Sequence, residues 1–298
     1  IDDESLISSE DVVVTVTHSG YIKRVPLSTY RAQRRGGKGR AGMSTREEDF
    51  VNQVFVVNTL TPLLFFSSRG IVYRLKTYKL PIGSPTSRGK AIINLLPLKA
   101  GEKINTLMPY NETDNKNNII FATAKGNVRR NKLTDFQNIN ANGKIAMKLV
   151  DNDRLVNVIT CEETANIFLS SKLGKCIRFI AKDIRLFSGR TSIGVRGIKL
   201  SKDDSVISLA ILRNIKFEVE ERDKYLKISS LIKKGEKVPN PEIDDDIIEK
   251  FKDNEEFILS VTDKGYGKRS SAYEYRVTKR GGVGIANMQL TDRNGNEV

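Results

Sequence analysis

The sequence predicts an all-β fold built from repeated four-stranded units, and three observations support this. A glycine-bearing turn recurs five times, each time after an apolar run. A second glycine, in a basic stretch, follows each turn at a nearly constant distance. Outside one segment, no amphipathic helical periodicity separates the strands, which excludes a parallel α/β fold. Such arrays are typical of propeller-like folds, in which each blade buries its faces against its neighbours.

The recurring turns predict five β-hairpins. Each turn follows an apolar run, such as residues 12–14 or 63–66, and the turn glycines are spaced by 50, 56, 48 and 91 residues. Glycine supplies the positive φ that the turn needs between two antiparallel strands. The turn glycines are Gly20, Gly70, Gly126, Gly174 and Gly265.

An arginine stands four residues after every turn glycine, on the second strand of each predicted hairpin. Two roles are open for it: support of cross-strand pairing, or contact with a nucleic acid. The five arginines are Arg24, Arg74, Arg130, Arg178 and Arg269.

The second glycine of each unit follows 17 to 20 residues after the first and precedes a short apolar strand. These glycines are Gly39, Gly89, Gly143, Gly194 and Gly284. A further strand, such as residues 155–159, closes most units, which gives four strands per unit of about 50 residues. The fifth unit reaches Val298 where its closing strand is expected, so we expect it to be truncated. The predicted boundaries are a lead-in at 1–11 and blades at 12–61, 62–117, 118–164, 165–212 and 256–298.

Residues 213–255 interrupt the array and are predicted to form a small helical or disordered insert. Tyr225, Ile228, Leu231 and Ile232 stand at helical spacing, and a second helical candidate begins at Asp244. The insert carries 12 acidic and 10 basic residues, a net charge of −2.

Net charge points to a polyanionic partner. The chain has 50 Lys and Arg against 36 Asp and Glu, or +14, and without the insert 40 basic residues face 24 acidic ones, or +16. Such an excess favours nucleic acid or an anionic membrane. No apolar run of about 18 residues is present to span a membrane, and the acidic start lacks signal-peptide features. We therefore expect a cytoplasmic fragment of a longer chain.

The first unit contains the strongest cation cluster, Gln33-Arg34-Arg35-Gly36-Gly37-Lys38-Gly39, followed by Arg40. Glycines let the backbone approach a phosphate, and arginine offers it a bidentate fork. No residue here is arranged to read base edges, so contact with backbone and shape is expected. The fifth unit repeats the cluster in part at Arg280-Gly281-Gly282-Val283-Gly284.

This seven-residue box matches, at every position, the signature of the C-terminal DNA-wrapping domain of DNA gyrase A subunits, which the chain resembles over nearly its whole length. The resemblance implies a β-pinwheel that binds duplex DNA non-specifically and bends it around a basic rim, in support of ATP-dependent negative supercoiling. It also implies an A2B2 assembly with the B subunit of gyrase and with the rest of the A subunit. This chain would need no cofactor of its own, because ATP and Mg would act on other domains. The residues expected to contact DNA are Gln33, Arg34, Arg35, Gly36, Gly37, Lys38, Gly39, Arg40, Arg74, Arg88, Lys90, Arg130, Lys144, Arg178, Arg190, Arg196, Arg269, Lys279 and Arg280.

Two other functions remain open at this point. The C-terminal domain of topoisomerase IV A subunits shares the fold and serves substrate selection, but its box is degenerate. A propeller that binds protein partners would show mixed charge and no concentrated phosphate-binding turn. No catalytic or metal site is expected in this chain: His18 is predicted on an exposed turn, and Cys161 and Cys176 are predicted as reduced thiols in or beside the core.

Overall fold

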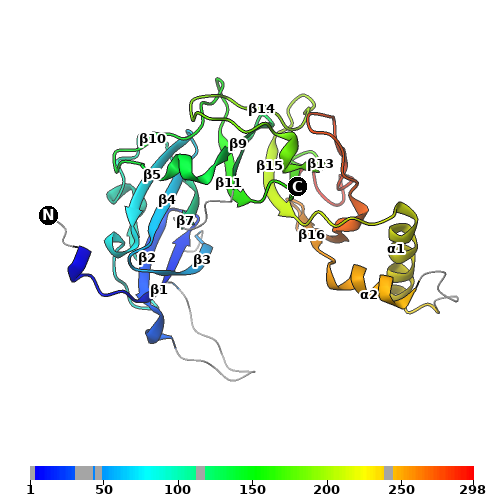
Figure 1. Ribbon diagram of the computed structural model, residues 1–298, viewed down its shortest axis with the longest axis horizontal. Helices are drawn as coiled ribbons and strands as arrows, with labels where there is room; N and C mark the ends of the chain where they lie inside the picture. The colour runs from blue at the N-terminus through cyan, green and yellow to red at the C-terminus, as the bar shows by residue number, and fades with distance from the viewer. Residues whose placement is uncertain (1–3, 31–42, 44–48, 112–117, 238–243) are drawn as a thin grey trace. The chain divides into compact units, whose positions relative to one another are not determined.

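The computed structural model describes residues 4–30, 43, 49–111, 118–237 and 244–298. Two compact units divide the chain. The first contains residues 1–115, 133–155 and 189–192, and the second contains 116–132, 156–188 and 193–298. The ribbon is dominated by short antiparallel strands, with two α-helices in one segment (Figure 1). The predicted all-β fold with a helical insert is confirmed.

The first unit contains two four-stranded sheets. One has the order β3-β1-β2-β6, and the other has the order β10-β5-β4-β7. Their strands are β1 (Asp11–Thr17), β2 (Tyr21–Pro26), β3 (Val51–Asn58), β4 (Pro62–Ser67), β5 (Ile71–Lys76), β6 (Lys90–Ala91), β7 (Ile104–Pro109) and β10 (Lys144–Ile145).

The second unit contains two four-stranded sheets, ordered β11-β8-β9-β14 and β15-β12-β13-β18, and a two-stranded sheet, β16-β17. Its strands are β8 (Asn118–Thr123), β9 (Asn127–Lys132), β11 (Leu155–Cys161), β12 (Asn166–Ser171), β13 (Lys175–Ile180), β14 (Val195–Arg196), β15 (Val206–Leu212), β16 (Phe257–Val261), β17 (Gly267–Ser271) and β18 (Ile285–Ala286).

A short 3₁₀ helix follows the second strand of every hairpin and turns the chain toward the long connection that carries the second glycine. In the five repeats these helices are η2 (Leu27–Thr29), η3 (Thr77–Lys79), η5 (Leu133–Phe136), η6 (Ala181–Asp183) and η7 (Ala272–Glu274). Two further 3₁₀ helices are η1 (Glu4–Leu6) and η4 (Ile92–Asn94).

The sheets differ from the predicted contiguous units, because the strand after the second glycine joins the preceding repeat. Thus β6 pairs with β2 through Tyr21↔Ala91, and β18 pairs with β13 through Cys176↔Ile285. β10 and β14 do the same with β5 and β9. We call β6, β10, β14 and β18 the exchange strands. Each four-stranded sheet therefore contains three strands of one repeat and two residues of the next.

Within each unit, the core lies between consecutive sheets. In the first unit, Val12, Val14 and Val16 pack with Leu63 and Phe65 in one buried cluster. In the second unit, β8 and β12 meet in a cluster that contains Ile120 and Leu169. On the other face of β12, Phe168 packs against Ala272 and Tyr275 of the fifth repeat. Continuous apolar strands, and not alternating ones, are expected for sheets covered on both sides.

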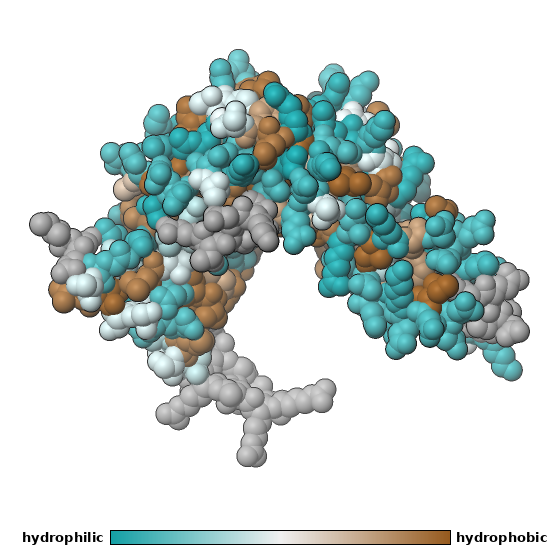
Figure 2. All heavy atoms as spheres, in the orientation of Figure 1, coloured by the Kyte–Doolittle hydropathy of each residue, from teal (hydrophilic) through white to brown (hydrophobic). Residues whose placement is uncertain are grey.

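The insert forms two α-helices, α1 (Val219–Lys234) and α2 (Asp245–Asp253), as its periodicity predicts. Gly235 ends α1 in the left-handed conformation with φ 71°. Tyr225 and Phe251 stack with ring centroids 5.0 Å apart, and the Oη of Tyr273 donates to the carbonyl of Phe251 at 2.9 Å. Because Tyr273 belongs to the fifth repeat, the insert is packed against that repeat by an aromatic cluster. The face of the insert seen in Figure 2 is mostly hydrophilic, with hydrophobic residues between the hydrophilic ones.

The second glycines within the described residues are required by close approach as well as by φ. Gly284 has φ +72°, and a Cβ at this position would overlap the carbonyl oxygen of Cys176 on the neighbouring strand. Gly194 is in the same position relative to the carbonyl of Val128. At the turn glycine Gly265, φ is +79°, but a Cβ there would meet no atom within 4 Å. The exchange strands thus approach their partners so closely that a side chain would push them away.

We predict that Gly284→Ala destabilises the second unit more than Gly265→Ala does. The Gly265 change costs about 1–2 kcal/mol, the strain of a left-handed alanine, and the Gly284 change adds the overlap with Cys176. Chemical denaturation measures both free energies of unfolding. Gly267→Ala is the control, because Gly267 has neither a positive φ nor a neighbour within 4 Å. Equal losses at Gly284 and Gly265 would show that the exchange strand does not need the close approach.

Buried cations also tie consecutive repeats together. The Lys23 side chain on β2 is fully buried, and its Nζ donates to the carbonyls of Ser84, Pro85 and Ser87 at 2.8, 2.7 and 2.8 Å. These acceptors belong to the connection that leads to β6. Burial lowers the pKa of Lys23 below its usual value. All three donors of the ammonium are used, so the first repeat holds the connection of the second in one conformation.

We predict that Lys23→Met destabilises the first unit by about 2–4 kcal/mol, because three carbonyls lose their charged donor. Lys90→Met is the matched control: it removes the same charge from an exposed position on β6, where a surface change costs about 0.5 kcal/mol or less. Denaturation gives both values. Similar losses for the two variants would mean that Lys23 does not anchor the connection.

Candidate nucleic-acid interface

The strongest predicted contact cluster, Gln33 to Gly39 with Arg40, lies outside the described residues, so its role stays a prediction. The equivalent connections of the other repeats are described. We call residues 84–90, 138–144, 189–196 and 279–284 the second-glycine loops. Each contains cations that are fully or partly accessible to solvent, and together they carry seven of the predicted contact residues. Lys90, Arg196 and Lys279 are exposed, and Arg88, Lys144, Arg190 and Arg280 are half-buried.

Neighbouring groups orient several of these cations without neutralising them. The guanidinium of Arg88 lies 3.8 Å from the ring centroid of Tyr21, a cation–π contact. Lys144 Nζ donates to the carbonyl of Asn138 at 3.0 Å. Arg280 donates through Nε to the carbonyl of Asp183 at 2.9 Å and through Nη1 to that of Arg196 at 3.1 Å. A guanidinium has five donors. Arg280 can therefore bind these two carbonyls of the fourth repeat and still donate to a phosphate.

The arginines that follow the turn glycines are placed differently. Arg130 and Arg178 are only 6% and 5% exposed. Arg130 Nε donates to the carbonyl of Ile184 at 2.7 Å, and Arg178 Nη1 donates to that of Ala272 at 2.6 Å. Both acceptors belong to the next repeat. Neither guanidinium faces solvent, so we assign these two arginines to the packing of repeats and omit them from the proposed contact surface.

The other three turn arginines are more accessible. Arg24 and Arg74 are half-buried. Arg24 Nε donates to the carbonyl of Leu80 at 3.0 Å, and Arg74 Nη1 donates to that of Gln137 at 2.9 Å. Arg269 is exposed, and its guanidinium lies 3.9 Å from the ring centroid of Phe257. The first four arginines are thus hydrogen-bonded to the next repeat, a contact that differs from the cross-strand pairing considered from the sequence, and contact of Arg74 and Arg269 with DNA stays a prediction.

Sequence reasoning missed a second set of exposed cations at the hairpin tips. Arg69, Lys125 and Lys264 each stand immediately before a turn glycine and are exposed. The signal was present, since a basic residue precedes the turn glycine in three of the five repeats. A search for basic residues around the second glycines alone does not find it.

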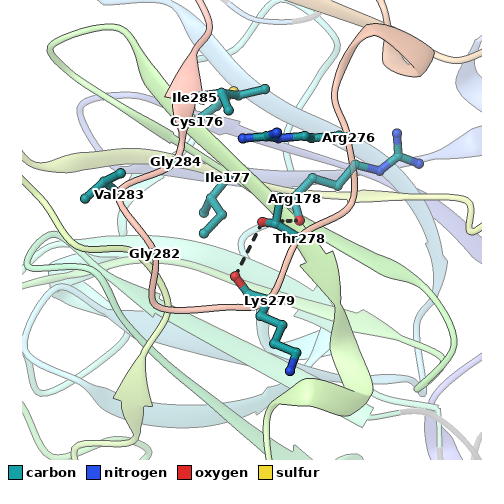
Figure 3. A pocket seen from close by; sticks show the side chains of 10 residues that line it. All are labelled: Cys176, Ile177, Arg178, Arg276, Thr278, Lys279, Gly282, Val283, Gly284 and Ile285. Atoms are coloured by element: carbon teal, nitrogen blue, oxygen red, sulfur yellow. Dashed lines mark hydrogen bonds between the residues drawn. The ribbon is translucent and has the colours of Figure 1, made fainter.

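A cleft of about 220 Å³ lies beside the second-glycine loop of the fifth repeat (Figure 3). Cys176 and Ile177 of β13 and Ile285 of β18 form part of its wall, and Arg276, another exposed cation that the sequence analysis missed, lines it. In Figure 3 the Arg276 side chain extends toward Cys176 and Ile285, whereas the ammonium of Lys279 points away from Gly284. The cleft is thus open, partly apolar and flanked by cations.

The remaining chemically active side chains are placed as predicted. His18 is exposed on its turn and stacks on Phe50, with ring centroids 4.8 Å apart. Cys161 and Cys176 are free and buried, and burial raises their thiol pKa values to about 11 and about 12. Among the described residues, no group of three or more His, Cys, Asp and Glu side chains could hold a metal ion. No helix in the described part of the chain is long and apolar enough to cross a membrane.

Comparison with known proteins adds independent information. The sequence matches a family described as "DNA gyrase C-terminal domain, beta-propeller" in five segments, residues 11–58, 61–111, 117–162, 165–213 and 256–295. These segments coincide with the five repeats, and the gap between the last two contains the helical insert.

Curated relatives and solved structures agree with this match. The chain is 52% identical to the DNA gyrase A subunit of Rickettsia bellii, over 99% of the chain and 34% of the relative. It is 37% identical to the Escherichia coli protein, over 98% of the chain and 29% of the relative. The chain thus spans about a third of the length of such relatives.

Two solved structures share the fold at low sequence identity. The C-terminal domain of DNA topoisomerase IV has a TM-score of 0.72 and 21% identity, and the match covers 98% of this chain and 77% of that one. The DNA gyrase A C-terminal domain has a TM-score of 0.64 and 23% identity, with 97% and 81% covered. The segments matched by the family include the whole repeat array and extend over more than half of the sequence. The chain therefore belongs to the DNA gyrase C-terminal domain family.

Proposed function

We propose that this chain binds duplex DNA without sequence preference and bends it along the exposed cations of its repeats. One observation carries the proposal: accessible cations recur on the second-glycine loops of consecutive repeats, in a chain of the gyrase C-terminal domain family. These loops present charge to a phosphate backbone and contain no arrangement for reading bases. The +16 charge outside the insert supports the same partner.

Bending explains why the cations are distributed over many repeats. Smooth bending of 20–30 base pairs by 40–90° costs roughly 1–6 kcal/mol. A single loop with one or two cations cannot offset this cost along a continuous arc, because each surface contact with a phosphate contributes little by itself. In a series of repeats, each repeat bends a short part of the duplex and adds a few phosphate contacts that offset the cost of that bend.

In the cell, we propose that the chain acts within gyrase, in an A2B2 assembly with the B subunit and with the remaining part of the A subunit. DNA bent on this domain would be presented to the strand-passage machinery and would support ATP-dependent negative supercoiling. ATP and Mg would be used on other domains, and the assembly would act on the nucleoid in the cytoplasm. The intact Gln33–Gly39 box and the high identity to gyrase A relatives favour this role over substrate selection in topoisomerase IV.

We predict salt-sensitive, sequence-independent binding. If Z phosphates are neutralised, the logarithm of the association constant should fall with the logarithm of salt concentration at a slope of about −0.9Z, with Z of several or more. Titration of labelled duplexes of unrelated sequence at a series of salt concentrations measures the slope. A slope near zero, or strong preference for one short sequence, is inconsistent with the proposed mode of binding.

We predict that the box controls bending more than affinity. Replacement of Arg34, Arg35, Lys38 and Arg40 by Ala should weaken binding by roughly tenfold or less, because the other loops keep their cations, and should remove most of the bend. Energy transfer between the ends of a labelled duplex reports bending, and titration of the same duplex gives affinity. In the whole enzyme, the change should remove negative supercoiling and spare relaxation.

The control removes the same four charges from the insert, at the exposed residues Lys216, Lys227, Lys234 and Lys237. This quadruple Ala variant should bend DNA normally. It is preferable to deletion of the insert, which would expose Tyr273 of the fifth repeat. Equal loss of bending in both variants would indicate an effect of net charge, and preserved bending with a collapse of affinity in the box variant would make the box an anchor.

A further inference from the structure

The turn arginines occupy one position in every repeat, at the middle of the second hairpin strand. The register pairs Arg24 with Val14, Arg74 with Leu64, Arg130 with Ile120 and Arg178 with Phe168. In these four pairs the apolar partner is at most 2% exposed. In the fifth repeat Arg269 pairs with Leu259, which is 70% exposed. The fifth repeat thus provides an internal comparison: the same arginine, without a following repeat packed against it in the described chain.

The acceptors of the first four guanidinium groups are equivalent as well. Each arginine donates to backbone carbonyls in or next to the 3₁₀ helix that follows the hairpin of the next repeat. Carbonyls at the end of a short helix have no partner within the helix and are good acceptors; Ala272, at the start of its helix, accepts in addition from the N–H of Tyr275 at 3.2 Å. The acceptors are Tyr78 and Leu80 for Arg24, Gln137 for Arg74, Ile184 for Arg130, and Ala272 and Tyr275 for Arg178.

The backbone of three of these arginines is also bonded to the next repeat. The N–H of Arg24 donates to the carbonyl of Pro81 at 2.9 Å, and Gly83 N–H donates to the carbonyl of Arg24 at 3.0 Å. The carbonyl of Arg130 accepts from Phe187 N–H, and that of Arg178 accepts from Thr278 N–H, both at 2.8 Å. The side chain and main chain of one residue therefore hold the next repeat at two points, which restricts rotation as well as separation.

The chemistry of this contact is specific to arginine. A planar guanidinium donates in fixed directions, whereas a lysine ammonium is a point charge on a flexible stem. Arg178 reaches carbonyls on two elements, Ala272 O at 2.6 Å and Arg213 O at 3.0 Å, through different nitrogens. Lysine at this position would keep the charge, but its single nitrogen could not donate to both carbonyls in the directions that the guanidinium fixes. A charge-conserving change therefore separates geometry from electrostatics.

We propose that Arg24, Arg74, Arg130 and Arg178 are positioning residues that set the angle between consecutive repeats, and thereby the curvature along which the second-glycine loops meet DNA. Only the second part of this inference, the curvature that DNA meets, rests on the proposed function. The first half, the angle between repeats, concerns the protein alone. On this view the arginines make no contact with DNA and act on bending through the placement of the loops.

The first experiment measures the angle without DNA. Spin labels are attached through Lys202→Cys in the fourth repeat and Arg293→Cys in the fifth, both exposed positions; the buried native thiols stay unlabelled in the folded protein. Double electron–electron resonance should give a narrow distance distribution that Arg178→Lys shifts or broadens. Arg269→Lys is the control and should leave the distribution unchanged. An unchanged distribution in folded Arg178→Lys would overturn the proposal.

The second experiment measures bending and affinity of the whole chain on a labelled duplex. Arg178→Lys should reduce the bend by roughly half or more while the Kd stays within about threefold of the parent value, since no charge is lost. Arg222→Lys, the same charge-conserving change at an arginine of the insert that pairs with Asp223 at 2.6 Å, should change neither. A shifted label distance with a normal bend would overturn the link to wrapping, and a fall in affinity with a normal bend would indicate direct contact.

Two further outcomes are decided within the same design. If the parent chain fails to bend DNA, the proposed function has failed, and the label distances alone decide whether arginine sets the angle. If Arg178→Lys does not fold, Arg74→Lys replaces it in the bending assay. Arg74 is half-buried and donates to Gln137 O at 2.9 Å, so its loss is milder, and a normal bend in that folded variant would count against the proposal.

Discussion

The exchange of two residues between neighbouring repeats is the constraint on which the rest of this structure depends. A hairpin such as β12–β13 has apolar side chains on both faces, so it cannot stay exposed on either side. β18 of the next repeat completes its sheet, and Ala272 and Tyr275 cover its second face. The glycine that permits the close approach, Gly284, also belongs to the segment that carries the accessible cations. Fold and proposed function therefore depend on the same connection: the segment that completes the neighbouring sheet is the one that presents charge.

The cations of this chain belong to two populations that composition cannot separate. Lys23, Arg129, Arg130 and Arg178 are buried and hydrogen-bonded within the array, whereas Lys90, Arg196 and Lys279 are exposed on the second-glycine loops. Both populations contribute to net charge, and both therefore contribute to the field that a polyanion meets. Only the exposed group can form hydrogen bonds to phosphate. The proposed contact surface is thus smaller than the net charge suggests, because some of the cations bind carbonyls within the array instead of facing solvent.

The sequence was sufficient to predict the fold class, the five hairpins and the two insert helices, because these depend on local signals. Glycines with positive φ, such as Gly70 and Gly174, and helical spacing around Tyr225 are such signals. Strand exchange could not be predicted, since a two-residue strand such as Lys90–Ala91 has no periodicity, and its partner is chosen by packing. The role of Arg178 was equally inaccessible: its acceptor Ala272 lies 94 residues away, beyond the insert. The role of residues 33–40 in DNA binding stays a prediction, because they lie outside the described part of the chain.

The choice of acceptor for the buried cations is consistent with binding to a polyanion. A buried guanidinium or ammonium must be hydrogen-bonded, because an unpaired buried charge is very costly. Carboxylates would satisfy it, but each would subtract a positive charge from the array that we propose to attract phosphate. Here the acceptors of Lys23 are backbone carbonyls, and those of Arg178 are backbone carbonyls and the side-chain amide of Asn166. None of these groups adds net charge. Arg130 combines the Ile184 carbonyl with Glu163 at 3.4 Å, a carboxylate that is itself 55% exposed. Carbonyl acceptors thus let cations join the repeats together while their charge still contributes to the positive field that the exposed loops present.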